Sequence, residues 1–407
     1  MKEISGGITA AKGFAAVAVE AGIKYSNRKD LALIYSESPC HGAGTFTTNV
    51  VKAAPVLWDQ EIIEKKGMIH AIVINSGYAN ACTGSQGMET CSAEAEYTAE
   101  CLSILKDSVL VASTGEIGKQ IPLEKLKEGI KKASKSFGTD LLAGEEAAKA
   151  IMTTDTVHKQ VAVTFTIGGK EVTMGGMCKG SGMIHPNMCT MLSFITCDIA
   201  ISKELLRKAV KEDVKDTYNM ISVDGDTSTN DTLLVLTNGL AGNAEILEEN
   251  EDYESFCEAL NYVNTKLAKK MAGDGEGATA LFEVTVYNAG SKEDGRTLAK
   301  SVICSSLTKA AIFGHDANWG RILCALGYSG VEFDPCNLDL YFKGKNKKIH
   351  IYGEGVAKDY SEEEASKILS EEEVCVEVDM HMGTERATAW GCDLSYDYVK
   401  INADYRS

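Results

Sequence analysis

The stretch KGSGMIHPNMCTML, residues 179–192, runs from a glycine-rich polar segment directly into apolar sequence. The apolar run continues through residue 195 and is typical of a buried strand. Connecting segments usually stay on the surface, so a polar segment that enters core sequence at the hydroxyl-bearing Thr190 is unusual. We interpret the stretch as a self-cleavage junction in which Thr190 becomes the N-terminal nucleophile of a second chain.

The chemistry of Thr190 would explain such a junction. An internal threonine hydroxyl can attack the preceding carbonyl, here that of Cys189, if the peptide bond is held under strain. Hydrolysis of the resulting ester frees the α-amine of Thr190, whose ordinary pKa of about 7.7–8.0 suits a general base at neutral pH. One residue then supplies both the nucleophile and its base. The plainer alternative is a threonine that only packs or caps at the start of a strand.

The composition limits the classes of partner. The 407-residue chain has a formal net charge of −17, which argues against nucleic acid and anionic membranes because both require basic patches. The apolar run at 14–19 is too short for a signal peptide or a membrane helix. The 13 cysteines include no Cys-x-x-Cys pair, so we expect reduced thiols and a cytoplasmic location.

Strand-like and helix-like segments alternate along the chain, which predicts an α/β (α+β layered) class with mixed sheets sandwiched by helices. Expected strands cover residues 31–35, 71–74, 108–112, 161–167, 172–174, 191–195, 233–236, 282–287, 349–352 and 374–380. Expected helices cover residues 88–106, 122–137, 145–152, 203–216, 253–270 and 297–311, and one more begins at Ser361. A change of character near residue 285 suggests a smaller C-terminal α/β domain.

Three further features could carry chemistry. The strand 108–112 is expected to break at Thr114 and Gly115, and backbone N–H groups left without ladder partners there could face an oxyanion. Lys179 could hold a substrate carboxylate, and Glu276, in the loop GDGEGAT (273–279), could receive an amine. The plainer alternatives are an ordinary strand end, a solvated loop lysine and a polar turn.

Metal and phosphate sites are disfavoured. Cys178, His185, Cys189 and Cys197 form a loose set that lacks the closely spaced pairs of structural zinc sites, so we expect no metal. The segment around Lys179 reads Lys-Gly-Ser where a phosphate loop needs Gly-Lys-Ser.

In their order along the chain, a set of short motifs resembles the ornithine acetyltransferase family, also called glutamate N-acetyltransferase. The resemblance spans nearly the whole chain and rests on residues 179–192 together with TAAKGF (9–14), FTTN (46–49), AAPV (53–56), NSG (75–77), NA (80–81), STG (113–115), MTTDT (152–156), DGEGA (274–278), GHDANWGR (314–321) and NADYRS (402–407). Each motif alone is weak, but the ordered set is specific.

The resemblance implies a complete enzyme. The precursor would cleave between Cys189 and Thr190, and Thr190 would carry the acetyl group of N2-acetylornithine to glutamate by a ping-pong mechanism in arginine biosynthesis. Thr114 and Gly115 would form the oxyanion hole. Substrate contacts would come from Thr153, Lys179, Thr190, Glu276, Asn402 and Ser407.

The resemblance also implies an organisation. Residues 1–189 would be the first chain of the catalytic domain, residues 190–285 would complete that domain, and residues 286–407 would form the C-terminal domain with a tail that returns to the site. Two copies of each chain would assemble as a heterotetramer. No cofactor is expected, although acetyl-CoA could serve as a second acetyl donor.

Two alternatives stay open at this point. One is a related self-processing amidase or aminopeptidase that passes the acyl group to water. The other is an unprocessed binding protein without catalytic activity.

Overall fold

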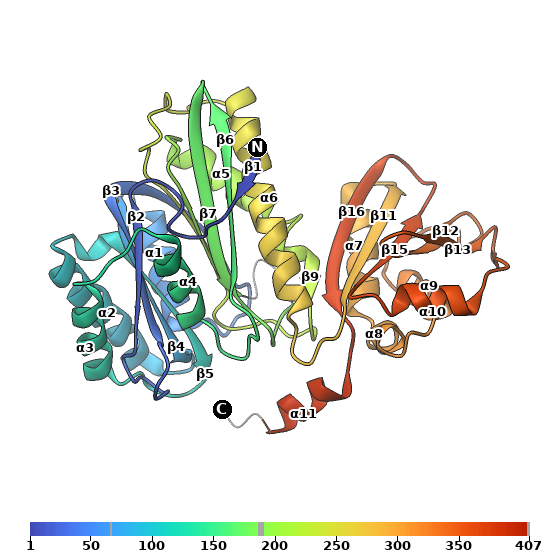
Figure 1. The fold of residues 1–407 in the computed structure, drawn as a ribbon, viewed down its shortest axis with the longest axis horizontal. Helices are drawn as coiled ribbons and strands as arrows, with labels where there is room; N and C mark the ends of the chain where they lie inside the picture. Colours follow the sequence, from blue (N-terminus) through green and yellow to red (C-terminus); the bar gives the residue numbers. More distant parts are fainter. Residues whose placement is uncertain (66, 186–190, 405–407) are drawn as a thin grey trace.

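Two mixed sheets and the helices around them form the computed structural model, which describes residues 1–65, 67–185 and 191–404 (Figure 1). In spatial order the larger sheet contains β1 (Lys2–Ile4), β6 (Lys159–Ile167), β7 (Lys170–Lys179), β8 (Leu192–Cys197), β10 (Thr232–Thr237), β3 (Leu31–Phe46), β4 (Ile69–Tyr78) and β5 (Val109–Glu116), and β2 (Phe14–Val19) pairs with the first half of β3. The pairs β8–β10 and β4–β5 are parallel, and the other pairs are antiparallel.

The smaller sheet is built mainly from the C-terminal third of the chain. In spatial order it contains β14 (Val356–Ala357), β13 (Lys348–Gly353), β12 (Asp339–Lys343), β15 (Glu373–Asp379), β11 (Leu281–Ala289), β16 (Glu385–Cys392) and β9 (Ile221–Ser222). Strand β9 comes from the segment just before β10, so the chain passes from the smaller sheet to the larger one within a single loop.

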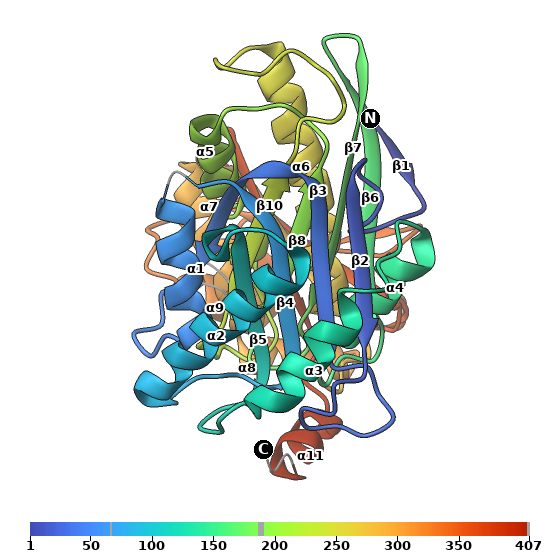
Figure 2. The same cartoon turned by 90° about the vertical axis from the view of Figure 1, so that its left-hand side faces the viewer.

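Helices cover the larger sheet and join it to the smaller one. Figure 2 shows α1 (Ala54–Glu64), α2 (Gly84–Leu102), α3 (Leu123–Ala133) and α4 (Leu141–Ala150) over one face of the β2–β5 region. Helix α6 (Glu251–Gly273) packs on β6 and β7 and also on β11 and β16, so it lies between the two sheets. The remaining helices are α5 (Lys203–Asp213), α7 (Lys292–Cys304), α8 (Ser306–Phe313), α9 (Trp319–Gly327), α10 (Glu362–Leu369) and α11 (Tyr396–Asp404).

The apolar run after the junction is a fully buried strand, as the sequence predicts. Leu192 and Phe194 of β8 pack into the core beneath α1–α4, whereas Met191 and Ile195 pack into the core that contains α6. Because both faces of β8 are buried, its sequence LSFITC carries no charged residue, and its two hydroxyl residues, Ser193 and Thr196, are buried and hydrogen-bonded.

Several predicted elements differ from the structure in their bounds, and two of these differences bear on the fold. The helix expected at 297–311 is broken at Ser305, whose side chain accepts a hydrogen bond from the N–H of Thr308 and so caps the start of α8. The strand expected to break after residue 112 instead continues through Glu116, with Thr114 paired to Ser76 and Gly115 paired to Gly77. The local sequence favours a break, but pairing with β4 supplies ladder partners and continues the strand.

Candidate active site

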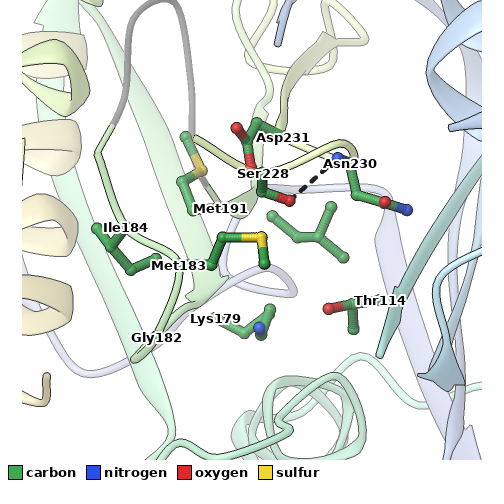
Figure 3. A pocket seen from close by; sticks show the side chains of 10 residues that line it. Thr114, Lys179, Gly182, Met183, Ile184, Met191, Ser228, Asn230 and Asp231 are labelled. Carbon is green, nitrogen blue, oxygen red and sulfur yellow. Dashed lines mark hydrogen bonds between the residues drawn. The ribbon is translucent and has the colours of Figure 1, made fainter. Parts of the chain in front are cut away.

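A small cavity lies beside the point where the junction re-enters the larger sheet (Figure 3). Its lining residues come from β5, the end of β7 and the loop after it, the start of β8 and the loop before β10: Thr114, Lys179, Gly182, Met183, Ile184, Met191, Leu192, Ser228, Asn230 and Asp231. Lys179 and Leu192 are partners across the β7–β8 ladder, so the intervening loop leaves and rejoins the sheet at one place. Cys189, Thr190 and Ser407 lie outside the described residues.

Lys179 is the last residue of β7 and is buried, with 8% of its surface exposed. The alternative of a solvated loop lysine is therefore wrong, because the strand extends five residues beyond its expected end at Met174 and carries the side chain inward. Burial lowers the pKa of the Lys179 ammonium, and the nearby Asp155 carboxylate opposes that shift. The side chain faces the cavity together with Thr114.

Thr114 and Gly115 lie on β5, at the edge of the larger sheet, where alternate N–H groups of a strand point away from its neighbour. Gly115 has a φ of 129°, and a Cβ built on it would lie 2.3 Å from the carbonyl carbon and oxygen of Gly77. Only glycine allows this close backbone approach. The geometry keeps Thr114 at the wall of the cavity.

Asn230 fixes the backbone next to Thr114, a role that no sequence motif predicted. Its Nδ2 donates to the carbonyl oxygens of Ser113 at 2.8 Å and Ala79 at 2.6 Å. The Thr229 hydroxyl donates to Asn230 Oδ1 at 2.6 Å, which orients the amide. The signal available in the sequence was a polar loop, residues 222–232, placed directly before a buried strand.

Asp231 brings a buried carboxylate to the same cavity. It is 1% exposed, and its Oδ2 has no hydrogen-bond partner among the described residues. Burial raises the pKa of Asp231 well above its ordinary value, although the Ser228 hydroxyl and the Lys179 charge act in the opposite direction. A buried carboxyl beside a buried lysine is typical of functional sites.

Glu276 lies against the loop that follows Lys179. Its N–H donates to the carbonyl of Ser181 at 2.9 Å, and a Cβ on Gly182 would lie 2.4 Å from the Glu276 carboxyl carbon. Asn402 of α11 donates from Nδ2 to Glu276 Oε2 at 2.8 Å. The structure therefore brings the glycine-rich loop, Glu276 and the C-terminal helix together.

Thr153 follows α4 and is joined to the cavity through Asp155. The Thr153 N–H donates to Asp155 Oδ2 at 3.1 Å, and the Gly180 N–H donates to Asp155 Oδ1 at 2.7 Å. Asp155 thus links the loop that contains Thr153 to Gly180, the residue that follows Lys179. Thr153 itself lines a separate open cleft with Arg28 and Lys149.

Cys178, His185 and Cys197 do not converge. Cys178 and Cys197 are buried in β7 and β8, and His185 Nδ1 lies 3.0 Å from the Ser222 hydroxyl. Within the described residues, no group of three His, Cys, Asp or Glu side chains is arranged to hold a metal ion. In the same part of the chain, no helix is long and apolar enough to cross a membrane.

Comparison with known proteins identifies the family. Residues 15–407 match the ArgJ family model. The arginine biosynthesis bifunctional protein ArgJ 1 of Clostridium acetobutylicum is 54% identical over 400 residues, which cover 98% of this chain and 97% of the relative.

Two solved structures are similar over about half of the chain. The crystal structure of the arginine biosynthesis bifunctional protein ArgJ from Bacillus halodurans is 43% identical with a TM-score of 0.50, and the match covers 52% of this chain and 98% of that one. An ornithine acetyltransferase from Mycobacterium tuberculosis, solved with ornithine, is 44% identical over 46% of this chain and 97% of its own, with a TM-score of 0.42. The chain therefore belongs to the ArgJ family, the bifunctional acetyltransferases of arginine biosynthesis.

Proposed function

We propose that the chain cleaves itself between Cys189 and Thr190 and then uses Thr190 to transfer acetyl groups between amino acids. The observation that carries this proposal is the cavity beside Met191, the residue that directly follows Thr190, because Thr114 and Lys179 both line it. The cavity thus brings the proposed carboxylate-binding lysine and the proposed oxyanion-hole strand to the residue that follows the proposed nucleophile.

In the cleavage step, the Thr190 hydroxyl attacks the Cys189 carbonyl and the peptide nitrogen leaves as the α-amine. Water then hydrolyses the ester, which releases the Cys189 carboxylate and restores the hydroxyl. The size of the Bacillus halodurans match supports this step. It accounts for 98% of that chain but only 52% of this one, and residues 190–407 are about 54% of this chain.

In the transfer step, the freed amine accepts the proton of the Thr190 hydroxyl as the oxygen attacks the acetyl carbon of N2-acetylornithine. Backbone groups of Thr114 and Gly115 stabilise the oxyanion. The ornithine nitrogen takes the proton and leaves, and the amine of glutamate then attacks the acetyl-threonine ester to give N-acetylglutamate. Acetyl-CoA is a second donor for the same ester.

Of the proposed substrate-binding residues, Lys179 lines the cavity, and Glu276 lies against Gly182, which also lines it. Lys179 binds the carboxylate of the amino acid, Glu276 receives the side-chain amine of ornithine, and Asn402 holds Glu276 in place from α11. Thr153 and Ser407 complete the contacts. Two copies of each chain form a heterotetramer in the cytoplasm. Residues 1–189 and 190–285 make up the catalytic domain, and residues 286–407 form the C-terminal domain.

Mass spectrometry tests the proposal. Purified protein should show two chains that begin at Met1 and Thr190, and incubation with N2-acetylornithine should add one acetyl group to Thr190. Thr190→Ala should leave one intact chain without activity. An unmodified Thr190 during normal turnover would exclude the acetyl-threonine mechanism.

The choice of acceptor separates this function from that of a related amidase. The proposal expects N-acetylglutamate to form in step with ornithine release. Free acetate in its place, with no dependence on glutamate, would assign the chain to hydrolysis. Radiolabelled acetyl-CoA with glutamate measures the second activity directly.

A further inference from the structure

Lys159 is a lysine with no exposed surface, and the proposed reaction assigns it no role. It is the first residue of β6 and pairs across the ladder with Cys178, next to Lys179. Its Nζ lies 2.7 Å from Asp155 Oδ1 and 2.5 Å from Asp274 Oδ2, and it also donates to the Val157 carbonyl at 3.3 Å. A buried ammonium is costly unless it is paired in this way.

The two aspartates lie on the segments that carry the substrate contacts. Asp155 accepts from the N–H groups of Thr153 and Gly180, and Gly180 directly follows Lys179. Asp274 accepts from the N–H of Thr156, its carbonyl accepts from the Ser181 hydroxyl at 2.7 Å, and Glu276 is two residues further along the chain. Lys159 therefore joins three loops, and Asp274 lies on the other side of the proposed cleavage point from Lys159 and Asp155.

Two buried lysines and two aspartates form this cluster, and the carboxyls of Asp231 and Glu276 also lie near Lys179. Lys159 and Lys179 contribute two positive charges, and Asp155 and Asp274 contribute two negative charges. Burial alone would raise the pKa of Asp155, but the ammonium groups of Lys179 and Lys159 hold it at about 2, so Asp155 is a carboxylate in need of a cation. Without Lys159, the remaining buried cation beside Asp155 is Lys179.

We propose that Lys159 is a positioning residue that occupies Asp155 and Asp274 and thereby leaves Lys179 directed into the cavity for a substrate carboxylate. This role depends on the carboxylate contact that we propose for Lys179. Lys159 would also connect the two chains that cleavage produces, because Asp155 belongs to the first chain and Asp274 to the second.

Steady-state kinetics of Lys159→Met test the role. We expect the KM for both N2-acetylornithine and glutamate to rise about tenfold or more, because Lys179 turns toward Asp155 and its charge-assisted contact with substrate is weakened. The double variant Lys159→Met/Asp155→Asn should recover most of the KM, since an amide still accepts the Gly180 N–H but no longer attracts Lys179. A purely structural role would change stability without this rescue.

A matched control separates positioning from general stability. Arg296 makes a two-bond ion pair with Asp216 at 2.9 and 3.0 Å, outside the cavity, so Arg296→Met should lower stability and leave both KM values unchanged. If Lys159→Met does not accumulate as folded protein, Lys159→Gln keeps a donor for the aspartates without the charge and should show the same rise in KM. Wild-type KM values in the folded variant, or no rescue by Asp155→Asn, would overturn the role.

The same assay distinguishes failure of this role from failure of the proposed function. Lys179→Met should raise both KM values at least as much as Lys159→Met. If Lys179→Met has no effect, the carboxylate contact itself is wrong. If Lys179→Met raises KM and Lys159→Met does not, the contact stands and only the positioning role of Lys159 is wrong.

Discussion

The two sheets differ in how far the lysines of their ion pairs are exposed to solvent. Beside the start of β6 in the larger sheet, the side chains of Lys159 and Asp155 are fully buried against each other. In the smaller sheet, Glu377 forms ion pairs with Lys343 at 2.7 Å and Lys348 at 2.6 Å, but about half of each lysine side chain is exposed. Buried ion pairs often cost more in desolvation than they return, and exposed pairs contribute little. The buried charges of Lys159 and Asp155 are thus better explained by function than by stability.

The backbone shows the same contrast, and alanine at two glycines should produce the largest difference. Gly115 at the cavity and Gly330 beyond α9 both have positive φ, but an added Cβ at Gly330 has nothing within 4 Å. We expect Gly115→Ala to cost about 4 kcal/mol or more, through its clash with Gly77, and to abolish transfer. Gly330→Ala should cost about 1 kcal/mol and leave kinetics unchanged. Urea denaturation of both variants measures the difference, and equal losses would contradict it.

Removing one lysine from each set of ion pairs, Lys159 or Lys348, should give the next largest difference in the free energy of unfolding. Lys159→Met leaves two buried carboxylates without their shared cation, and loss of one partner from a buried pair costs about 3–5 kcal/mol. Lys348→Met leaves Glu377 paired with Lys343, so its cost should stay below about 1 kcal/mol. Chemical denaturation at one pH compares the two. A similar cost for both would mean that burial of the cavity charges has little energetic effect.

The same contrast explains which features could be predicted from the sequence. The apolar runs at 191–195 and 233–236 predict β8 and β10 well, because a strand buried on both faces leaves a continuous apolar signal. Lys179, Glu276 and Asn402 stood out through the motifs around them. The structure places Lys179 at the cavity and joins Glu276 to Asn402 beside it.

Other parts of the site depend on contacts between distant segments, and no local pattern reveals these. Lys159 and Asp274 are 115 residues apart, and Asn230 reaches Ser113 across 117 residues. The end of β5 was wrong for the same reason. Local sequence favours a break at residues 113–115, but pairing with β4 carries the strand on to Glu116.

The pH dependence of stability gives a smaller test, because the pKa values of buried carboxyls shift in opposite directions in the two regions. Burial raises the pKa of Asp59 and Glu94, which lie under the larger sheet, so their stabilising effect is complete below the ordinary pKa near 4 and is lost as the pH rises. Burial would also raise the pKa of Glu377, but Lys343 and Lys348 lower it overall, so its effect is lost as the pH falls.

The variants Glu94→Gln and Glu377→Gln separate these two effects. We expect Glu94→Gln to reduce the loss of stability between pH 5 and pH 8, and Glu377→Gln to reduce the loss below about pH 4. Urea denaturation across both ranges provides the measurement. An unchanged decline between pH 5 and pH 8 in Glu94→Gln would show that Glu94 is already ionised in the folded protein across this range.

Two histidines provide the finest comparison, with little effect on stability. Burial, assisted by the charge of Lys300, lowers the pKa of His185 to about 4, whereas the hydrogen bond to Asp339 raises the pKa of His381 in the smaller sheet above 6.5. His381 stabilises the fold below its unfolded pKa, and this effect fades as the pH rises through its folded pKa. Because the ring is 41% exposed, solvent screens the pair and the change should be small. NMR titration should show His185 neutral from pH 5 to 8 and His381 charged at pH 6. Asp339→Asn should lower the His381 value and leave that of His185 unchanged, and a matching shift of His185 would mean that the two regions are electrostatically coupled.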